Sequence, residues 1–341
     1  MNLAQRVAYY GERLPLPDVL SKAAIKWLVE RTRRKLAYQT PDADRRFVLD
    51  MAAYPIAIHT ADANAQHYEL PAEFFALCLG RQRKYSCCLY DNGIDTLDRA
   101  GERALAVTAE HAALANGQRI LELGCDWGSL SLWMARNFPH ARITSVSNSG
   151  SQRAYILAQA KIQNLSNLDV ITADMNDFRP TEKFDRVVSV EMFEHMSNWY
   201  PLLQHIRASL VPDGRLFIHI FTHKTTPYRF ELADKDDWIA QHFFTGGIMP
   251  SHRLIRQFSD SFEIEDEWYW NGVNYQKTAA HWLENFDRNA DAIRSILRDV
   301  YGPDAALWQR RWRLFFLATM GLFGHDDGTE WGVSHYRLHP V

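Results

Sequence analysis

The sequence contains few cysteines, no long apolar run and little net charge. A membrane-spanning helix needs about 18 or more consecutive apolar residues, and no such run is present. The N-terminus also lacks the apolar core of a signal peptide. The 38 basic and 41 acidic residues leave a formal net charge of −3, which argues against a generally basic nucleic-acid-binding protein.

The cysteines are too few and too closely spaced for a disulfide scaffold, and no Cys-x-x-Cys pair suggests a metal site. We therefore expect reduced thiols in a cytoplasmic protein without a bound metal. The four cysteines are Cys78, Cys87, Cys88 and Cys125.

Aromatic residues, in contrast, are abundant. They make up 13% of the chain, with 11 Trp, 14 Tyr and 18 Phe, which is more than a bare nucleotide-binding core needs. This excess is consistent with an aromatic-lined pocket or with additional helical core. At 341 residues, the chain is long enough for one large domain or two smaller ones.

The first 40 residues are basic, with eight Lys or Arg against three acidic residues. Within them, residues 21–36 show helical apolar spacing and predict a basic amphipathic helix. Packing of this helix on the rest of the domain is the favoured interpretation, and contact with an acidic membrane surface is the alternative. A second helix is predicted at about 44–58. We expect residues 1–66 to form an N-terminal helical segment.

Short apolar runs alternate with helical segments from Gly117 onward, which predicts an α/β fold with a mostly parallel, seven-stranded sheet and helices on both faces. Segments at about 222–260 and 277–323 do not fit a minimal sheet and are expected to be helical lid insertions. The predicted strands are 119–123, 142–147, 168–172, 185–190, 215–221, 262–268 and 333–338, and the helices between them are 129–136, 151–163 and 199–210.

A glycine-bearing turn, Ile120-Leu-Glu-Leu-Gly124-Cys-Asp-Trp-Gly128, follows the first strand and opens a helix. Glycine lets the backbone approach a ligand closely, and the helix N-terminus offers free N–H groups. The Gly-x-Gly-x-x-Gly fingerprint of a dinucleotide dehydrogenase is absent. Asp126 stands where many related turns have glycine, and its acidic side chain disfavours a pyrophosphate.

The turn and the strand spacing together resemble the class I S-adenosylmethionine-dependent methyltransferases, a Rossmann-like fold. Further motifs resemble the cyclopropane-fatty-acid synthase superfamily, and within it the coclaurine N-methyltransferase branch. The resemblance runs from about His67 to the C-terminus, so we expect residues 67–341 to form the methyltransferase domain. The motifs are Lys84-Tyr-Ser-Cys-Cys88, Glu191-Met-Phe-Glu-His-Met196, His219-Ile-Phe-Thr-His-Lys224, Phe243-Phe-Thr-Gly-Gly-Ile-Met-Pro-Ser251, Asn271-Gly-Val-Asn-Tyr275 and Glu330-Trp-Gly-Val-Ser-His335.

This resemblance implies S-adenosylmethionine as the cofactor, with S-adenosylhomocysteine as its product. Tyr85 and Ser86 would hold the cofactor carboxylate, and Gly124 and Gly128 would form the cofactor loop. The remaining implied contacts are Ser147, Asn148 and Gln152 at the ribose, and Asp174 and Met175 at the adenine.

Three titratable residues follow the fourth predicted strand, where the resemblance places the methyl acceptor. Carboxylates of Glu191 and Glu194 can hold an incoming ammonium, and His195 can take its proton. Glu194 and His195 are adjacent and cannot face identically, so one could support while the other acts. His195 could instead be a supporting residue at a helix start, and Glu191 could bind the cofactor's amino group.

The resemblance also assigns an acceptor pocket and implies an arylalkyl or isoquinoline-type amine as substrate. His67, Tyr68 and Glu69 would line it, and Phe323 and Trp331 would supply aromatic walls, with His223 nearby. In cyclopropane synthases, residues matching Cys87, Glu194, His219 and Tyr275 bind a bicarbonate that serves as base. The sequence therefore leaves open whether this protein also binds bicarbonate.

Two rival functions are compatible with the same motifs. The first is methylation of an unsaturated phospholipid acyl chain, as in cyclopropane-fatty-acyl-phospholipid synthases, and Glu191 argues against it because an unpaired carboxylate is costly beside an acyl chain. The second is a non-catalytic cofactor-binding protein, favoured only by Asp126. The expected partner is a small-molecule amine and not a nucleic acid, with peripheral membrane contact and a homodimer as further alternatives.

Overall fold

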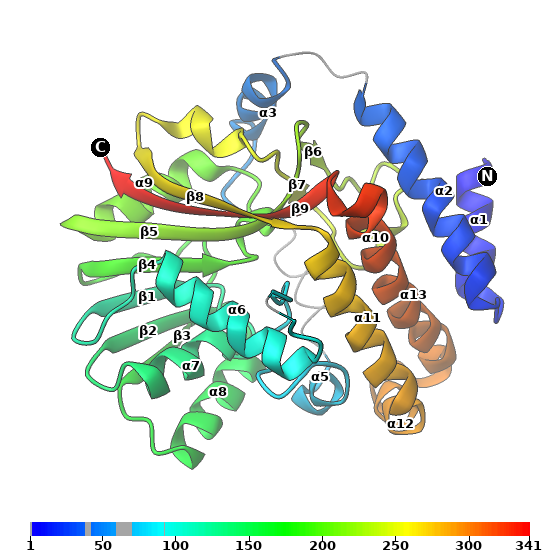
Figure 1. Ribbon diagram of the computed structural model, residues 1–341, viewed down its shortest axis with the longest axis horizontal. Helices are drawn as coiled ribbons and strands as arrows, with labels where there is room; N and C mark the ends of the chain where they lie inside the picture. Colours follow the sequence, from blue (N-terminus) through cyan, green and yellow to red (C-terminus); the bar gives the residue numbers. More distant parts are fainter. Residues whose placement is uncertain (1, 38–41, 59–69, 92) are drawn as a thin grey trace.

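A mostly parallel, seven-stranded sheet forms the centre of the computed structural model, which describes residues 2–37, 42–58, 70–91 and 93–341 (Figure 1). The strand order is β3-β2-β1-β4-β5-β9-β8, and the first five of these strands are mutually parallel. β9 runs antiparallel between β5 and β8. The strands are β1 (Arg119–Leu123), β2 (Arg142–Ser147), β3 (Leu168–Thr172), β4 (Phe184–Val190), β5 (Leu210–His223), β8 (Phe262–Asn271) and β9 (Trp331–Pro340). This arrangement confirms the predicted sheet.

Helices cover both faces of the sheet. Alternate side chains of β1 enter two different cores, because successive residues of a strand point to opposite faces. Ile120 packs under one helical layer, and Leu121 and Leu123 pack under the other. The first layer contains α6 (Leu97–His111), α7 (Ser129–Asn137) and α8 (Gly150–Ile162), and the second contains α3 (Ala43–Met51), α9 (Trp199–Ser209) and the 3-10 helix η2 (Leu254–Phe258).

Helix α3 is shorter than predicted. The predicted helix 44–58 ends at Met51, four residues before Pro55. Proline has no N–H to donate and disfavours helical conformation in the residue before it, so the apolar spacing beyond Met51 does not continue the helix.

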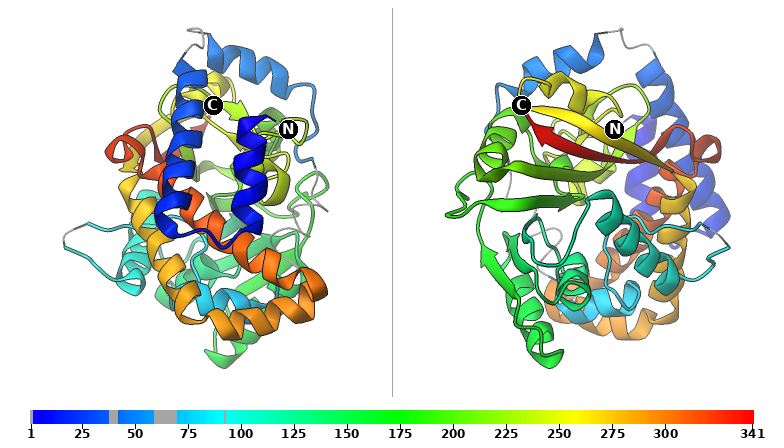
Figure 2. Two further views of the ribbon diagram at one scale, coloured as in Figure 1. Left: turned by 90° about the vertical axis from the view of Figure 1, so that its right-hand side faces the viewer. Right: turned by 60° about the vertical axis from the view of Figure 1, so that its left-hand side comes forward.

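A third core lies beside the sheet, where the N-terminal helices meet the predicted lid. The segment expected at 277–323 forms three consecutive helices, α11 (Val273–Arg288), α12 (Ala290–Tyr301) and α13 (Ala305–Phe323). Val29 and Leu36 of α2 (Asp18–Ala37) are buried in the same core as Trp312 and Phe316 of α13. Figures 1 and 2 show α1 (Leu3–Arg13) and α2 lying across α13. The N-terminal helices are thus packed on α13.

The other insertion, at 222–260, was expected to be helical, but it forms mostly turns and short elements beside the carboxyl end of β5. Pro227, Pro250 and the Gly246-Gly247 pair interrupt any long helix there. The remaining elements of the described chain are α5 (Ala72–Cys78), β6 (Tyr228–Arg229), α10 (Trp238–His242), β7 (Ile248–Met249), and the 3-10 helices η1 (Phe193–His195), η3 (Gly302–Asp304) and η4 (His325–Gly328). The predicted boundary between residues 66 and 67 lies outside the described residues. None of the described helices is both long and apolar enough to cross a membrane.

Candidate active site

A cavity of about 1200 Å³ opens at the carboxyl ends of the parallel strands. In an open α/β sheet this is the edge at which ligands bind. The cavity brings together residues that the sequence assigned to the cofactor. These are Tyr85, Ser86, Gly124, Ser147, Asn148, Gln152, Asp174 and Met175. Gly128 is the one predicted cofactor residue that does not line it.

The two glycines of the β1–α7 turn have left-handed backbones, which glycine adopts without strain. Gly124 has φ +78°, and a Cβ there would come within 2.5 Å of the Met192 side chain. Gly128 has φ +76°, and a Cβ would come within 2.6 Å of Ile156. Gly124 therefore keeps the cavity wall free of a side chain, whereas Gly128 lets α7 and α8 pack together.

Asp126, between these glycines, is also left-handed at φ +46° and contributes its carboxyl to the cavity. Burial raises the pKa of this carboxyl to about 7. Gln152 Nε2 donates a hydrogen bond of 2.9 Å to Asp126 Oδ1, and Ser147 Oγ donates one of 2.6 Å to Gln152 Oε1. Asp126 is thus held by the same residues that were predicted to face a ribose.

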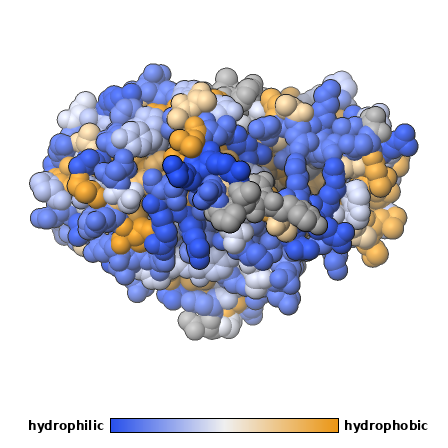
Figure 3. Space-filling view, turned by 90° about the horizontal axis from the view of Figure 1, so that it is seen from above, coloured by the Kyte–Doolittle hydropathy of each residue, from blue (hydrophilic) through white to orange (hydrophobic). Residues whose placement is uncertain are grey.

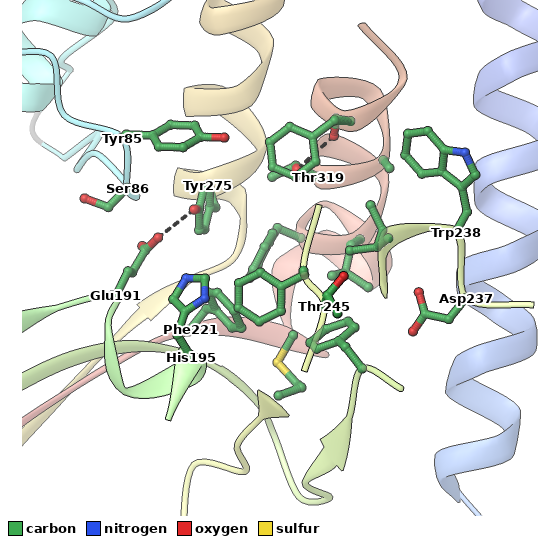
Figure 4. Close-up of a pocket in the computed structure, with 18 of the residues that line it drawn as sticks. Tyr85, Ser86, Glu191, His195, Phe221, Asp237, Trp238, Thr245, Tyr275 and Thr319 are labelled. Carbon is green, nitrogen blue, oxygen red and sulfur yellow. Dashed lines mark hydrogen bonds between the residues drawn. The ribbon is translucent and has the colours of Figure 1, made fainter. Parts of the chain in front are cut away.

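Glu191 lies directly after β4 and has a left-handed backbone at φ +47°. Its carboxylate accepts hydrogen bonds from the Cys87 amide at 2.9 Å, from the Tyr275 hydroxyl at 2.7 Å and from His219 Nε2 at 3.2 Å. Figure 4 shows the side chain directed at Tyr275 on the cavity wall. Burial raises the pKa of Glu191 above its usual value, although the Lys84 charge and the hydrogen bonds oppose this shift. The carboxylate is therefore fixed in orientation and poised to take a proton.

His195 also lines the cavity, from the 3-10 helix η1. Its ring centroid lies 4.4 Å from that of Phe244. Burial lowers the pKa of His195 to about 4, so the imidazole is neutral at pH 7. A neutral imidazole has a lone pair that can accept a proton or a hydrogen bond.

Glu194 faces a different direction from its neighbour and does not line the cavity. Its Oε1 accepts a hydrogen bond of 2.7 Å from the Phe221 amide of β5, and its side chain is fully buried. Burial, reinforced by the nearby Glu191, raises the pKa of Glu194 well above its usual value. Glu194 thus ties the η1 turn to β5.

The residues predicted for the acceptor are divided between the cavity and its surroundings. Tyr275 and Phe323 line the cavity, whereas Cys87, His219, His223 and Trp331 do not. His67, Tyr68 and Glu69 lie outside the described residues. His219 and the Cys87 backbone nonetheless act on the site through their hydrogen bonds to Glu191.

His223, Trp331 and the Cys87 thiol have other surroundings. His223 Nε2 lies 3.0 Å from Glu330, which also pairs with Lys224 at 2.6 Å, and Trp331 packs against the His223 ring at a centroid distance of 5.3 Å. Burial raises the pKa of the Cys87 thiol well above its usual value, so this thiol is not activated as a nucleophile.

Part of the cavity wall was missed by the sequence reasoning. The wall includes Ile25 and Leu28 of α2, and Phe230, Trp238 and Phe244 of the 222–260 segment. Only the aromatic excess pointed to such a wall, because helical spacing shows that a face is apolar but not what it covers. Among the described residues, no group of three or more His, Cys, Asp or Glu is arranged to hold a metal ion.

Comparisons with known proteins agree with this geometry. The family profile described as mycolic acid cyclopropane synthetase matches residues 57–325. The chain is 34% identical to (S)-coclaurine N-methyltransferase of Thalictrum flavum subsp. glaucum over 285 residues, which cover 82% of this chain and 79% of that protein. It is 31% identical to cyclopropane-fatty-acyl-phospholipid synthase of Escherichia coli (strain K12), over 80% of this chain and 67% of that protein.

The crystal structure of coclaurine N-methyltransferase bound to N-methylheliamine and SAH has a similar fold. The two structures superpose with a TM-score of 0.93 at 31% identity, and the match covers 98% of this chain and 99% of that chain. The match confirms the class I methyltransferase fold and includes the N-terminal helices.

Proposed function

We propose that this chain, which belongs to the mycolic acid cyclopropane synthetase family, is an S-adenosylmethionine-dependent N-methyltransferase acting on an arylalkyl or isoquinoline-type amine. The observation that carries this proposal is the Glu191 carboxylate, held by three hydrogen bonds at the wall of a cavity rich in aromatic side chains. A fixed carboxylate is suited to an ammonium group, whereas it is costly to bury beside an acyl chain.

The cavity residues fit S-adenosylmethionine, which supplies an electrophilic methyl group on its sulfonium when bound. Gly124 presents bare backbone on the cavity wall, and a Cβ there would strike Met192. We assign contacts with the ribose hydroxyls of the cofactor to Ser147, Asn148 and Gln152, and contacts with its adenine to Asp174 and Met175. The methionine carboxylate of the cofactor is assigned to Tyr85 and Ser86. All seven line the same cavity.

Glu191 and His195 prepare the acceptor nitrogen. A protonated amine has no lone pair, so a proton must leave before the nitrogen can act as a nucleophile. Glu191 attracts the ammonium group and accepts its proton, and the neutral His195 orients the nitrogen by hydrogen bonding. Alignment of the lone pair with the sulfonium methyl then governs the rate, because the leaving group is already a good one.

Aromatic side chains complete the acceptor site. Phe221, Phe244, Tyr275 and Phe323 line the cavity. Figure 4 shows Phe221 and Tyr275 on the same side of the cavity as Glu191. Tyr275 and Phe323 are stacked, with ring centroids 4.4 Å apart. Such rings bind flat aromatic amines and attract their positive charge by up to about 2 kcal/mol where water is excluded.

Glu191 also removes the need for bicarbonate in this proposal. The resemblance assigned Cys87, Glu194, His219 and Tyr275 to a bicarbonate base. In this chain Cys87, His219 and Tyr275 donate hydrogen bonds to Glu191, and Glu194 accepts one from the Phe221 amide. The base is then part of the chain itself. Full activity in buffer stripped of carbon dioxide and bicarbonate is the corresponding expectation.

Kinetics of two glutamate variants test this assignment. With labelled S-adenosylmethionine and tetrahydroisoquinoline amines, Glu191→Gln is expected to lower kcat by about 100-fold or more, because the amide cannot accept the proton. Glu194→Gln is the matched control and is expected to stay within about threefold of the wild type, since a neutral amide can accept the Phe221 hydrogen bond in the same way. Equal losses in both variants would contradict the role given to Glu191.

Peripheral membrane contact and a homodimer stay predictions. The N-terminal helices expose Leu3, Val19 and Leu20, and Figure 3 shows apolar side chains at the right-hand end of the molecule, the side where Figure 1 places these helices. Vesicle co-sedimentation would test the first prediction and sedimentation equilibrium the second.

A further inference from the structure

The cavity extends well beyond the groups assigned to the cofactor and to the amine nitrogen. Its volume of about 1200 Å³ exceeds the roughly 300–1000 Å³ of a pocket for one small ligand, so a cofactor and an acceptor can share it. Residues 231–239 and α2 line one part of the wall, and Figure 4 shows this part at the opposite side of the cavity from Glu191. The end of the acceptor that is remote from its nitrogen would lie here.

The carboxylate of Asp237 lies on this distal wall. Asp237 directly precedes α10, and its Oδ1 accepts a hydrogen bond of 3.0 Å from the Ala240 amide. Figure 4 shows the carboxylate directed into the cavity. Within the described part of the chain, its hydrogen bonds come only from backbone amides of α10. A carboxylate can accept about four hydrogen bonds, so Asp237 can accept further ones from a molecule in the cavity.

The neighbouring Asp236 is bound differently. Its carboxylate accepts hydrogen bonds from the side chains of Asn2 at 2.7 Å, Gln5 at 3.0 Å and Arg31 at 2.8 Å. Asp236 therefore joins α1 and α2 to the loop before α10. In contrast, no Lys or Arg nitrogen of the described residues lies within 4 Å of the Asp237 carboxylate. Of the two adjacent carboxylates, Asp237 is thus the one that can bind a ligand.

The surroundings of Asp237 favour a neutral hydrogen-bond donor. Burial raises the pKa of Asp237 to about 6, which leaves the carboxylate mostly ionised at pH 7. A buried charge with few donors is costly, so a ligand that offers a donor gains affinity here. Arg31 and Lys35 also line this part of the cavity and oppose a second ammonium group. A hydroxyl on an aromatic ring is a neutral donor, and its flat ring can pack against Trp238 on the same wall.

We propose that Asp237 accepts a hydrogen bond from a phenol hydroxyl at the end of the acceptor remote from its nitrogen, and so selects phenolic amines. This inference rests on the proposed N-methylation and narrows its substrate class. Glu191 binds the nitrogen end and Asp237 the hydroxyl end, so the two carboxylates align the amine across the cavity. Asp237 does not touch the reacting atoms, and it therefore acts on binding and orientation alone.

Methyl ethers of the same amines provide the first test, because a methyl ether lacks the donor and keeps the rest of the ligand. A site built for a donor rejects an analogue without one, since its buried acceptor is then left unpaired. The acceptors are phenolic arylalkylamines with alkyl chains of two to four carbons, each measured beside its methyl ether. In at least one pair we expect kcat/KM for the phenol to exceed that for the ether by about tenfold or more.

Asp237→Asn tests the residue without loss of the helix cap, because Asn caps a helix about as well as Asp. Its amide oxygen can accept the Ala240 hydrogen bond, which turns the NH2 group toward the cavity. For the preferred phenol, KM should rise about tenfold with kcat nearly unchanged, the pattern of binding lost away from the reacting atoms. The methyl ether should lose nothing, since its oxygen can accept from the NH2 group. Calorimetric Kd values of both amines, measured with S-adenosylhomocysteine bound, should change in the same way without turnover.

Asp236→Asn is the matched control. It is the same substitution at the neighbouring residue of the same cavity, but the Asp236 carboxylate is already bound by three side chains. The ratio of kcat/KM between phenol and ether should stay within about twofold of the wild-type ratio. A wild-type protein without preference for any phenol, or a ratio that Asp237→Asn leaves unchanged, would overturn the role of Asp237. A wild-type protein that methylates none of the amines would instead contradict the proposed N-methylation itself.

Discussion

Two non-glycine residues of the site, Asp126 and Glu191, adopt left-handed backbone conformations. Such conformations cost about 1–3 kcal/mol each and tend to occur at functional sites. In both residues the strained backbone places a carboxyl group on the cavity wall. The strain therefore accompanies two of the charged groups nearest to the proposed chemistry.

Asp126 links this strain to pH. An aspartate in an unfolded chain titrates near pH ~4, whereas burial raises the pKa of Asp126 to about 7. Between these values the folded state binds more protons than the unfolded state, so the contribution of Asp126 to stability falls as the pH rises from about 4 to 7.

Asp126→Asn removes this titration and keeps a side chain that tolerates a left-handed backbone. We expect the variant without cofactor to melt about 2–6 °C above the wild type at pH 8, with the difference vanishing near pH 4. Thermal melts at several pH values measure this directly. A difference in Tm that does not change with pH would show that burial of the Asp126 charge is not the cause.

The sequence predicted which residues line the cavity better than it predicted their orientation. Gly124, Asp174 and Glu191 could be placed because each follows a strand, and the carboxyl ends of parallel strands share one edge. The adjacent Glu194 and His195 were expected to face different directions, but the sequence could not tell which of them lines the cavity, because that depends on how the η1 turn meets β5. The cross-strand pairing of His219 with His335 likewise depends on a register between segments more than 100 residues apart.

At the scale of the elements, the buried carboxylate of Glu12 connects the N-terminal helices to the 222–260 and 305–323 segments. Glu12, at the end of α1, lies 3.0 Å from Arg311 Nε, 3.0 Å from Trp238 Nε1 and 3.4 Å from His242. Burial alone would raise the pKa of Glu12, but the hydrogen bonds from Arg311 and Trp238 outweigh it and lower the pKa. The ionised carboxylate thus holds one wall of the cavity together.

Glu12→Gln weakens this attachment. We expect a loss of about 2 kcal/mol in the free energy of unfolding at pH 7, because Arg311 is left with an uncompensated charge. A group with a lowered pKa stabilises the fold above its unfolded pKa, so the difference should shrink as the pH falls below about 4. Urea unfolding at pH 7 and at pH 4 measures the difference in unfolding free energy between the variant and the wild type. Glu182→Gln, at an exposed position, is the control. An equal loss in the control would contradict the role of Glu12.

The strands and helices themselves were largely predictable. The limits of β1, β2 and β3 agree with the predicted ones, because each is a short run rich in apolar residues between turn signals. The predicted helices 44–58 and 277–323 differ from the observed elements at Pro55 and at the two breaks that separate α11, α12 and α13. The placement of α2 over the cavity depends on long-range packing, on which helical periodicity carries no information.

At the scale of the whole molecule, the choice lies between a dissolved amine and a lipid as methyl acceptor. The family contains both kinds of enzyme among the relatives of this chain. The cavity favours the amine, since its carboxylate and aromatic walls suit a flat cation. The basic α2, which a lipid substrate would need as a membrane contact, instead lines the cavity and pairs with Asp236 through Arg31 at 2.8 Å.

The most direct test is methyl transfer from labelled S-adenosylmethionine to two pools of acceptors measured side by side. One pool contains arylalkyl and tetrahydroisoquinoline amines, and the other contains vesicles of unsaturated phospholipid. We predict labelled N-methylated amines, which Glu191→Gln no longer produces, and unlabelled lipid. Label in the lipid acyl chains, with the amines left unmethylated, would contradict N-methylation as the reaction of this protein.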